Sequence, residues 1–275
     1  MHPPGRRPTG PAELSPPMST AEPLRLPSAL RARVATARRV VAFTGAGISQ
    51  ESGLATFRGG GESLWERFRP EELATPQAFH AHPRRVWGWY AWRHRAADAA
   101  EPNPGHRALA RMAAVFPFFT LVTQNVDGLH QRAGSPEVLE LHGTLTRAHC
   151  GRCGAARPMA SALAESAEEP PPCPCGGRFR PAVVWFGEPL PGGVLERAVA
   201  ESSRCDLFLA VGTSATVYPA AGLVEVARGA GAAVIEVNPE ASALASLADL
   251  CVPRPAGHAL PALLEAMERC RKPAS

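Results

Sequence analysis

The stretch Arg39-Val40-Val41-Ala42-Phe43-Thr44-Gly45-Ala46-Gly47-Ile48-Ser49 decides the fold. Its first half is a compact apolar run with the length of a buried parallel strand. Its second half is a glycine turn, whose small residues let backbone N–H groups approach an anionic phosphate near a helix N-terminus. The turn is not a complete G-x-G-x-x-G, because Gln50 occupies the sixth position. On its own it fits a tight structural turn equally well.

The same strand pattern recurs along the chain and alternates with helical patterns. Further apolar runs lie at 118–123, 207–211 and 234–237, and helical stretches are expected at 28–39, 105–115, 192–203, 219–230 and 259–270. This alternation predicts a doubly wound, Rossmann-like α/β parallel sheet over 28–58, 101–145 and 182–275. A ligand is then expected in the cleft at the carboxyl ends of the strands.

Two segments do not fit the alternation and predict a smaller lobe. Residues 59–100 form a helical insertion rich in Trp, and residues 146–181 hold four cysteines among prolines and glycines. Cys150-x2-Cys153 and Cys173-x-Cys175 fit a tetrahedral Zn²⁺ site of structural type. Two alternatives remain: disulfide pairing, which a reducing compartment disfavours, and His149 as a replacement ligand if the tight C-x-C pair is strained.

Composition excludes several classes of protein. The chain has 275 residues, is 45% hydrophobic, and carries a net charge of +4. No apolar run approaches the roughly 20 residues that span a bilayer. The sequence also has no dense stripe of basic residues, which a nucleic-acid-binding domain would show. Pro-rich residues 1–27 predict a disordered tail; a transit peptide is the alternative, and secretion is disfavoured because no apolar h-region exists. A cytoplasmic location and a monomer are expected, the latter without a specific signal.

Polar residues mark the candidate site. Gln124, Asn125 and Asp127 follow the second strand, at the edge where an α/β sheet holds its ligands. His142 follows the apolar run 138–141, and the ordinary pKa of an imidazole suits a general base. A lone histidine is more often structural, so the position of His142 has to decide its role.

Several motifs, in one order over residues 32–266, resemble the sirtuin family of NAD-dependent protein lysine deacylases. They are 45–49, 51–54, 57–59, 123–130, 140–143, 183–188, 212–214, 218–221 and 236–240. The resemblance implies that His142 is the catalytic base, acting with Asn125 and Asp127. It implies NAD as co-substrate, acyl-lysine proteins or peptides as partners, and nicotinamide, free lysine and O-acyl-ADP-ribose as products.

The resemblance also assigns binding residues. It implies NAD contacts from Gly45, Ala46, Gly47, Ser49, Glu51, Phe57, Arg58, Gln124, Asn125, Asp127, Gly212, Thr213, Ser214, Asn238, Glu240 and Ala256. The peptide is expected to add as a strand between two segments, in contact with Val184, Phe186, Gly187, Glu188, Val217 and Tyr218.

Tyr90 and Arg93 bear on the acyl group. They are three residues apart on one helix face, and the structural alternative is that Arg93 only extends along the helix to water. In the sirtuin branch that removes succinyl, malonyl or glutaryl groups, a Tyr and an Arg at this spacing bind the acyl carboxylate. A small residue sixteen positions before the Tyr, here Ala74, opens the pocket. The resemblance therefore implies a preference for acidic acyl groups. Deacetylation, ADP-ribosyl transfer, a non-catalytic NAD-binding module and a dehydrogenase remain as alternatives.

Overall fold

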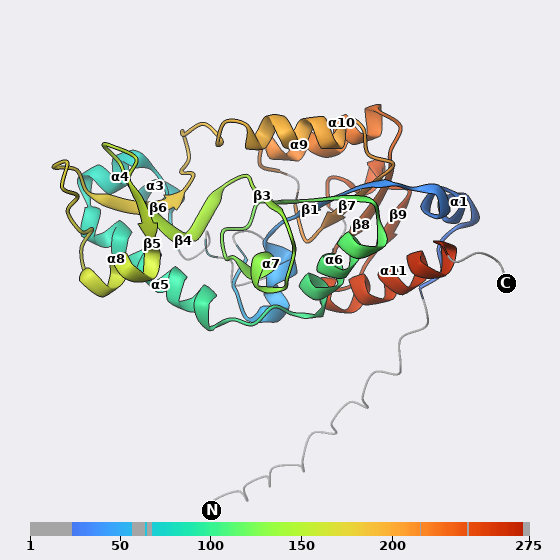
Figure 1. The fold of residues 1–275 in the computed structure, drawn as a ribbon, viewed down its shortest axis with the longest axis horizontal. Helices are drawn as coiled ribbons and strands as arrows, with labels where there is room; N and C mark the ends of the chain where they lie inside the picture. The colour runs from blue at the N-terminus through green and yellow to red at the C-terminus, as the bar shows by residue number, and fades with distance from the viewer. Residues whose placement is uncertain (1–23, 57–63, 65–67, 215, 241, 272–275) are drawn as a thin grey trace, which may run out of the picture.

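The computed structural model describes residues 24–56, 64, 68–214, 216–240 and 242–271. Most of the predicted tail, residues 1–23, and the candidate residues Phe57 and Arg58 lie outside the described residues. The described chain forms a large lobe around a parallel sheet and a smaller lobe joined to it (Figure 1).

The large lobe is built on a six-stranded parallel sheet with the order β3-β2-β1-β7-β8-β9. Its strands are β1 (Arg39–Thr44), β2 (Phe118–Thr123), β3 (Val138–Glu140), β7 (Leu207–Val211), β8 (Ala233–Val237) and β9 (Leu250–Val252). Their apolar character follows from helices covering both faces. The predicted doubly wound sheet is confirmed. The order reverses between β1 and β7, so a crevice is expected where these two strands end.

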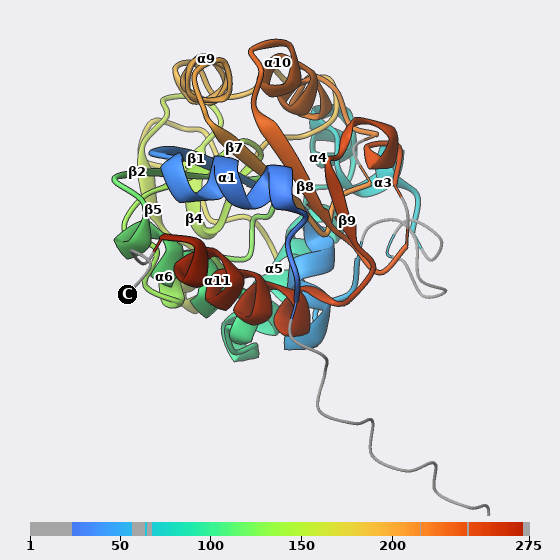
Figure 2. The same ribbon diagram turned by 90° about the vertical axis from the view of Figure 1, so that its right-hand side faces the viewer.

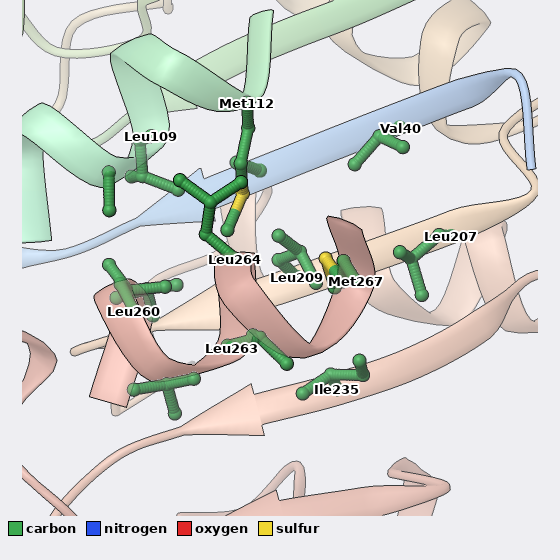
Figure 3. Close-up of a cluster of buried hydrophobic side chains, with 14 of the residues drawn as sticks. Val40, Leu109, Met112, Leu207, Leu209, Ile235, Leu260, Leu263, Leu264 and Met267 are labelled. Atoms are coloured by element: carbon green, nitrogen blue, oxygen red, sulfur yellow. The ribbon is translucent and has the colours of Figure 1, made fainter. Parts of the chain in front are cut away.

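Helices cover the two faces of this sheet in separate layers (Figure 2). One layer consists of α1 (Ser28–Thr36), α6 (Pro104–Val115) and α11 (Ala256–Arg271), and the other of α9 (Val194–Ser202) and α10 (Leu223–Gly229). Figure 3 shows the core on the first face, where α6 and α11 pack on β1, β7 and β8. Its fully buried side chains include Leu109, Met112, Leu209, Ile235, Leu260 and Met267.

The predicted strands of the large sheet are found within one residue, and two further strands are present. β3 and β9 have three residues each, which is too short for a strand pattern to stand out. The expected helix over 28–39 ends at Thr36, and the one over 259–270 begins three residues earlier, at Ala256.

The smaller lobe combines helices with a three-stranded antiparallel sheet of order β5-β4-β6. The strands are β4 (Gly143–Cys150), β5 (Ala156–Pro158) and β6 (Phe179–Val183), and the helices are α3 (Pro70–Leu73), α4 (Pro76–Ala81), α5 (Pro83–Ala99) and α8 (Met159–Glu165). Proline stands at the first position of α3, α4 and α5, where its missing N–H costs no hydrogen bond. The sequence predicted helices over 59–100, where α3, α4 and α5 lie, but predicted neither α8 nor the sheet.

Candidate functional site

A cavity of about 780 Å³ lies between the two lobes. It opens at the carboxyl ends of β1, β2, β7 and β8, as expected for a doubly wound sheet. The structure brings most of the predicted site residues to its wall: Gly45, Ala46, Gly47, Ala74, Tyr90, Arg93, Gln124, Asn125, His142, Val184, Phe186, Gly187, Glu188, Gly212, Thr213, Ser214, Val217, Tyr218, Asn238 and Glu240.

Two glycine turns meet at the end of β1 and β7. The Gly47 N–H donates to the Gly212 carbonyl at 2.9 Å. A Cβ on Gly45 would lie 2.7 Å from the Gly212 oxygen, and one on Gly47 would lie 2.8 Å from the Gly212 Cα. Gly212 has φ of +57°, and a Cβ there would collide with the backbone N of Ile48. Only glycine allows this approach, which explains why both turns contain it.

Asn125 and Asp127 are held behind the first turn by a short chain of hydrogen bonds. Asn125 Nδ2 donates to the Gly45 carbonyl at 3.1 Å and to Ser49 Oγ at 3.2 Å. Ser49 Oγ donates to Asp127 Oδ2 at 2.7 Å, and the Leu129 N–H donates to Asp127 Oδ1. Burial raises the pKa of Asp127 despite these bonds. Ser49 and Asp127 therefore form a layer directly behind the cavity wall.

His142 has the tautomer that a base requires. Its Nδ1 lies 3.0 Å from the Gln124 backbone carbonyl, which can only accept, so Nδ1 carries the hydrogen. The other nitrogen, Nε2, is then free to accept a proton. Burial lowers the pKa of His142, which keeps the ring neutral near pH 7.

The end of the cavity formed by the small lobe holds Ala74, Tyr90 and Arg93. Tyr90 is 2% exposed, and burial raises its pKa to about 12. Burial lowers the pKa of Arg93, whose guanidinium lies 5.5 Å from the Tyr90 ring centroid and 4.9 Å from that of Trp89. A phenol and a guanidinium thus face one cavity, and both can donate to an anion.

The rim of the cavity carries exposed aromatic side chains from two segments. Phe186 is 45% exposed and Tyr218 is 66% exposed, and both line the cavity. They belong to the two segments expected to hold a peptide strand. Exposed aromatic groups beside a cavity are typical of a binding surface.

At the far end, polar side chains from three strands meet around Thr213. Gln124 Nε2 donates to Thr213 Oγ1 at 2.8 Å, and Asn238 Nδ2 donates to the Thr213 carbonyl at 3.3 Å. These contacts place the 212–214 turn against the segment that follows β8. The end of the cavity near Glu240 is therefore lined by hydrogen-bonding groups of the large lobe.

Glu51 and Ala256 lie away from the cavity wall. The Glu51 carboxylate accepts the Gly257 N–H at 2.5 Å, close to the first residue of α11, and lies 3.7 Å from His258 Nε2. Glu51 therefore stabilises the positive end of that helix. Conversely, the cavity is lined by Gln50, Trp185, Leu195 and Glu196, which were not singled out as site residues. Trp185 lies within residues 183–188, one of the motifs that carry the family resemblance, and that motif is what could have marked it as a site residue.

The four predicted cysteines come together in the small lobe. Their Sγ atoms lie within 4.8 Å of one another, with 3.5 Å between Cys150 and Cys175 and 3.7 Å between Cys153 and Cys173. A tetrahedral site with Zn–S bonds of about 2.3 Å needs sulfurs about 3.8 Å apart. The cluster fits a structural zinc, and His149 is not part of it.

Gly177 shows how closely the chain wraps the cluster. A Cβ at this position would lie 2.7 Å from Cys150 Sγ. The C-x-C pair thus reaches the cluster because a glycine follows it.

In the described part of the chain, no helix is both long and apolar enough to cross a membrane.

Comparison with known proteins agrees with this arrangement. The Sir2 family model matches residues 45–219. NAD-dependent protein deacylase 2 of Pyrobaculum aerophilum is 51% identical over 238 residues, which cover 86% of this chain and 94% of the relative. A Sir2 homologue–NAD complex superposes with a TM-score of 0.81 at 42% identity, covering 92% of this chain and 98% of that one.

A Sir2 complex with a deacetylated peptide and 3'-O-acetyl ADP-ribose is also similar, with a TM-score of 0.79 at 30% identity. It covers 86% of this chain and 96% of that one. These matches agree with the fold, the paired glycine turns and the cysteine cluster described above. Their extent shows that the chain belongs to the Sir2 family.

Proposed function

We propose that this chain is an NAD-dependent protein-lysine deacylase that prefers succinyl, malonyl or glutaryl groups. The observation that carries the proposal is that one cavity is lined by His142 and Asn125 at its centre and by Tyr90 and Arg93 at its small-lobe end. Membership of the Sir2 family and a relative named a deacylase support the general activity. The acidic preference rests on the cavity itself.

The charge balance of the small-lobe end favours an anionic group. Arg93 is always cationic, and it is buried beside the Tyr90 phenol, so a carboxylate reaching this end would meet a positive charge with little water between them. A carboxylate could accept from both Arg93 and the Tyr90 hydroxyl. An acetyl group ends in a methyl and would leave both donors without that acceptor, so such sites reject the shorter analogue.

NAD would supply an electrophilic ribose carbon and nicotinamide as leaving group. The two glycine turns carry no Cβ and would let the phosphates approach the backbone closely. Asn125, whose amide donates to the Gly45 carbonyl, would orient the ribose. His142 would take a proton from a ribose hydroxyl at Nε2, because Nδ1 is committed to the Gln124 carbonyl. Phe186 and Tyr218 would flank the peptide.

The test is a matched set of acetyl-, succinyl- and malonyl-lysine peptides incubated with NAD, followed by peptide mass and nicotinamide release. Succinyl and malonyl peptides should be consumed faster than the acetyl peptide. His142→Ala should slow every reaction roughly 10²- to 10⁴-fold, as expected for a lost general base. Arg93→Met should lower succinyl kcat/KM roughly 10- to 100-fold and spare acetyl turnover.

Each contrary outcome has a defined meaning. Faster loss of acetyl, unaffected by Arg93→Met, would retain the deacylase and overturn the acidic preference. No loss of any acyl group, with NAD still bound, would contradict the deacylase and favour ADP-ribosyl transfer.

A further inference from the structure

We infer that Trp185 is a positioning residue for acyl selectivity, because its indole N–H fixes the direction in which the Tyr90 hydroxyl donates. The inference rests on the proposed function and adds a residue that acts through Tyr90. Trp185 Nε1 donates to the Tyr90 oxygen at 2.9 Å, and both residues are 2% exposed.

The groups around the Tyr90 hydroxyl restrict the direction in which its hydrogen can point. An indole N–H and a guanidinium can only donate, so neither Trp185 nor Arg93 can accept the phenolic hydrogen. The indole N–H occupies one side of the phenolic oxygen, which also accepts from the Arg93 side chain. The Tyr90 hydrogen is therefore directed away from Trp185, and the cavity that Tyr90 lines offers the place for an acceptor. An acyl carboxylate satisfies this donor, whereas the methyl of an acetyl group does not.

Trp185 can impose this direction because its ring is held on several sides. The Arg180 guanidinium carbon lies 3.4 Å from the ring centroid, and the Phe79 ring lies 5.2 Å away, centroid to centroid. The Trp185 backbone N–H donates to Glu188 Oε2 at 2.8 Å. Rotation of the indole would disrupt the contacts with Arg180 and Phe79, so these two side chains hold its N–H toward Tyr90.

Arg180 is fixed in turn by Glu188. The guanidinium donates to both carboxylate oxygens, at 2.5 and 2.9 Å, and to the Val183 carbonyl at 2.9 Å. Its side chain is only 10% exposed. Glu188 thus holds Arg180, Arg180 holds the Trp185 ring, and Trp185 donates to Tyr90. The first three residues lie in β6 or in the segment after it, and Tyr90 lies in α5. Selectivity for the acyl group is then built into the contact between two segments that are 95 residues apart.

The experiment compares kcat/KM for succinyl and acetyl peptides in Trp185→Phe, which removes the N–H and keeps an aromatic ring. The ratio of succinyl to acetyl kcat/KM should fall about fivefold, the equivalent of one neutral hydrogen bond, mainly through a higher KM for the succinyl peptide. Benzothienylalanine incorporated at position 185 keeps the bicyclic shape without the N–H. This variant should lower the succinyl-to-acetyl ratio by the same factor, and it replaces Trp185→Phe in the experiment if that variant does not fold.

A double-mutant cycle separates positioning from packing. In a Tyr90→Phe background, Trp185→Phe should cause no further fall in the ratio, because no hydroxyl remains to be oriented. Trp87→Phe is the matched control. Trp87 lies on α5 with Tyr90 and is fully buried, and its Nε1 donates to the Ser166 carbonyl at 3.0 Å, outside the cavity wall. It should leave the ratio unchanged.

The outcomes that overturn the inference differ from those that overturn the proposed function. A succinyl-to-acetyl ratio of kcat/KM that Trp185→Phe leaves unchanged, or the same fall in the Tyr90→Phe background, would each reject the inference alone. A wild-type protein that prefers acetyl peptides would reject the acidic preference, and the inference with it.

Discussion

His142 donates its Nδ1 hydrogen to the backbone carbonyl of Gln124 across 3.0 Å. The bond leaves Nε2 as the only basic nitrogen, and it connects the end of β2 to the residue before β4. Tautomer and ring orientation are therefore set by the junction between the two lobes. A change in how the lobes meet would also move the His142 ring.

The first prediction concerns the pH dependence of deacylation. Burial lowers the pKa of His142 from its ordinary 6.5, and only the neutral ring accepts a proton. The acid limb of kcat/KM should therefore have an apparent pKa below 6.5, with activity lost as pH falls through it. Initial rates with saturating NAD between pH 5 and 8 measure this, and a midpoint well above 6.5 would contradict it.

The second prediction concerns the depth of the acyl pocket. Ala74 is 5% exposed and lines the cavity, and its carbonyl accepts the Phe186 N–H at 2.9 Å. Ala74→Phe should fill this end and lower succinyl kcat/KM about tenfold, with a smaller effect on acetyl, because steric exclusion scales with acyl length. Ala81→Phe, at the exposed end of α4, is the control. Unchanged succinyl kinetics in Ala74→Phe would place the acyl group elsewhere.

The third prediction concerns the cysteine cluster. Cys173→Ser should remove one of four sulfur ligands, lower the zinc content from one ion per chain, and reduce Tm by several degrees, because metal binding is coupled to folding. Elemental analysis and a thermal scan with and without chelator measure both effects. Cys251→Ser, outside the cluster, should keep zinc and Tm. Full zinc content in Cys173→Ser would contradict a four-sulfur site.

The fourth prediction concerns the contact between the two glycine turns. Gly212→Ala should destabilise the protein and weaken NAD binding, because the residue has a positive φ and its Cβ would collide with Ile48. Unfolding in urea and calorimetric titration with NAD measure the two effects. Gly229→Ala is the control: its Cβ would meet open space in α10, so stability should hold or rise by up to about 1 kcal/mol. Wild-type stability in Gly212→Ala would refute the argument.

The fifth prediction concerns two buried histidines. Burial lowers the pKa of His106 to about 4 and that of His130 to about 3, and their ring centroids are 4.9 Å apart. Below pH 6.5 the unfolded chain binds more protons than the folded one. The free energy of unfolding should therefore fall between pH 6.5 and about 4, by up to about 1.4 kcal/mol per pH unit for each histidine.

Urea titrations at several pH values test this. His130→Gln should lower the slope of stability against pH over that range, whereas His80→Gln, exposed on α4, should not. A slope that is unchanged in His130→Gln would show that this ring does not supply the pH dependence.

The parallel sheet was predictable from local patterns because its main strands are continuous apolar runs, buried on both faces. β1, β2 and β7 have the predicted bounds. The antiparallel sheet of the small lobe was not predictable. β5 has three residues, and the segment between Cys150 and Phe179 is ordered around the cysteine cluster rather than by an alternating pattern.

The candidate site divides in a similar way. The strand-end residues Gln124 and Asn125 were predictable, because parallel strands end at one edge and bring their following residues together. The partner of Glu51 was not, since 206 residues separate it from the Gly257 N–H that it accepts. The contact between Trp185 and Tyr90 is of the same kind.

Residue types and their order along the chain were therefore sufficient for the parallel sheet, the glycine turns and the four clustered cysteines, because each depends on neighbours in sequence or on one periodic pattern. His142 was singled out as the candidate base only by the resemblance. The tautomer of His142, the direction of the Tyr90 hydroxyl and the place of Glu51 arose only when distant segments packed. A hydrogen bond depends on distances of a few tenths of an ångström and on angle, and for groups far apart in sequence only the packed chain sets both.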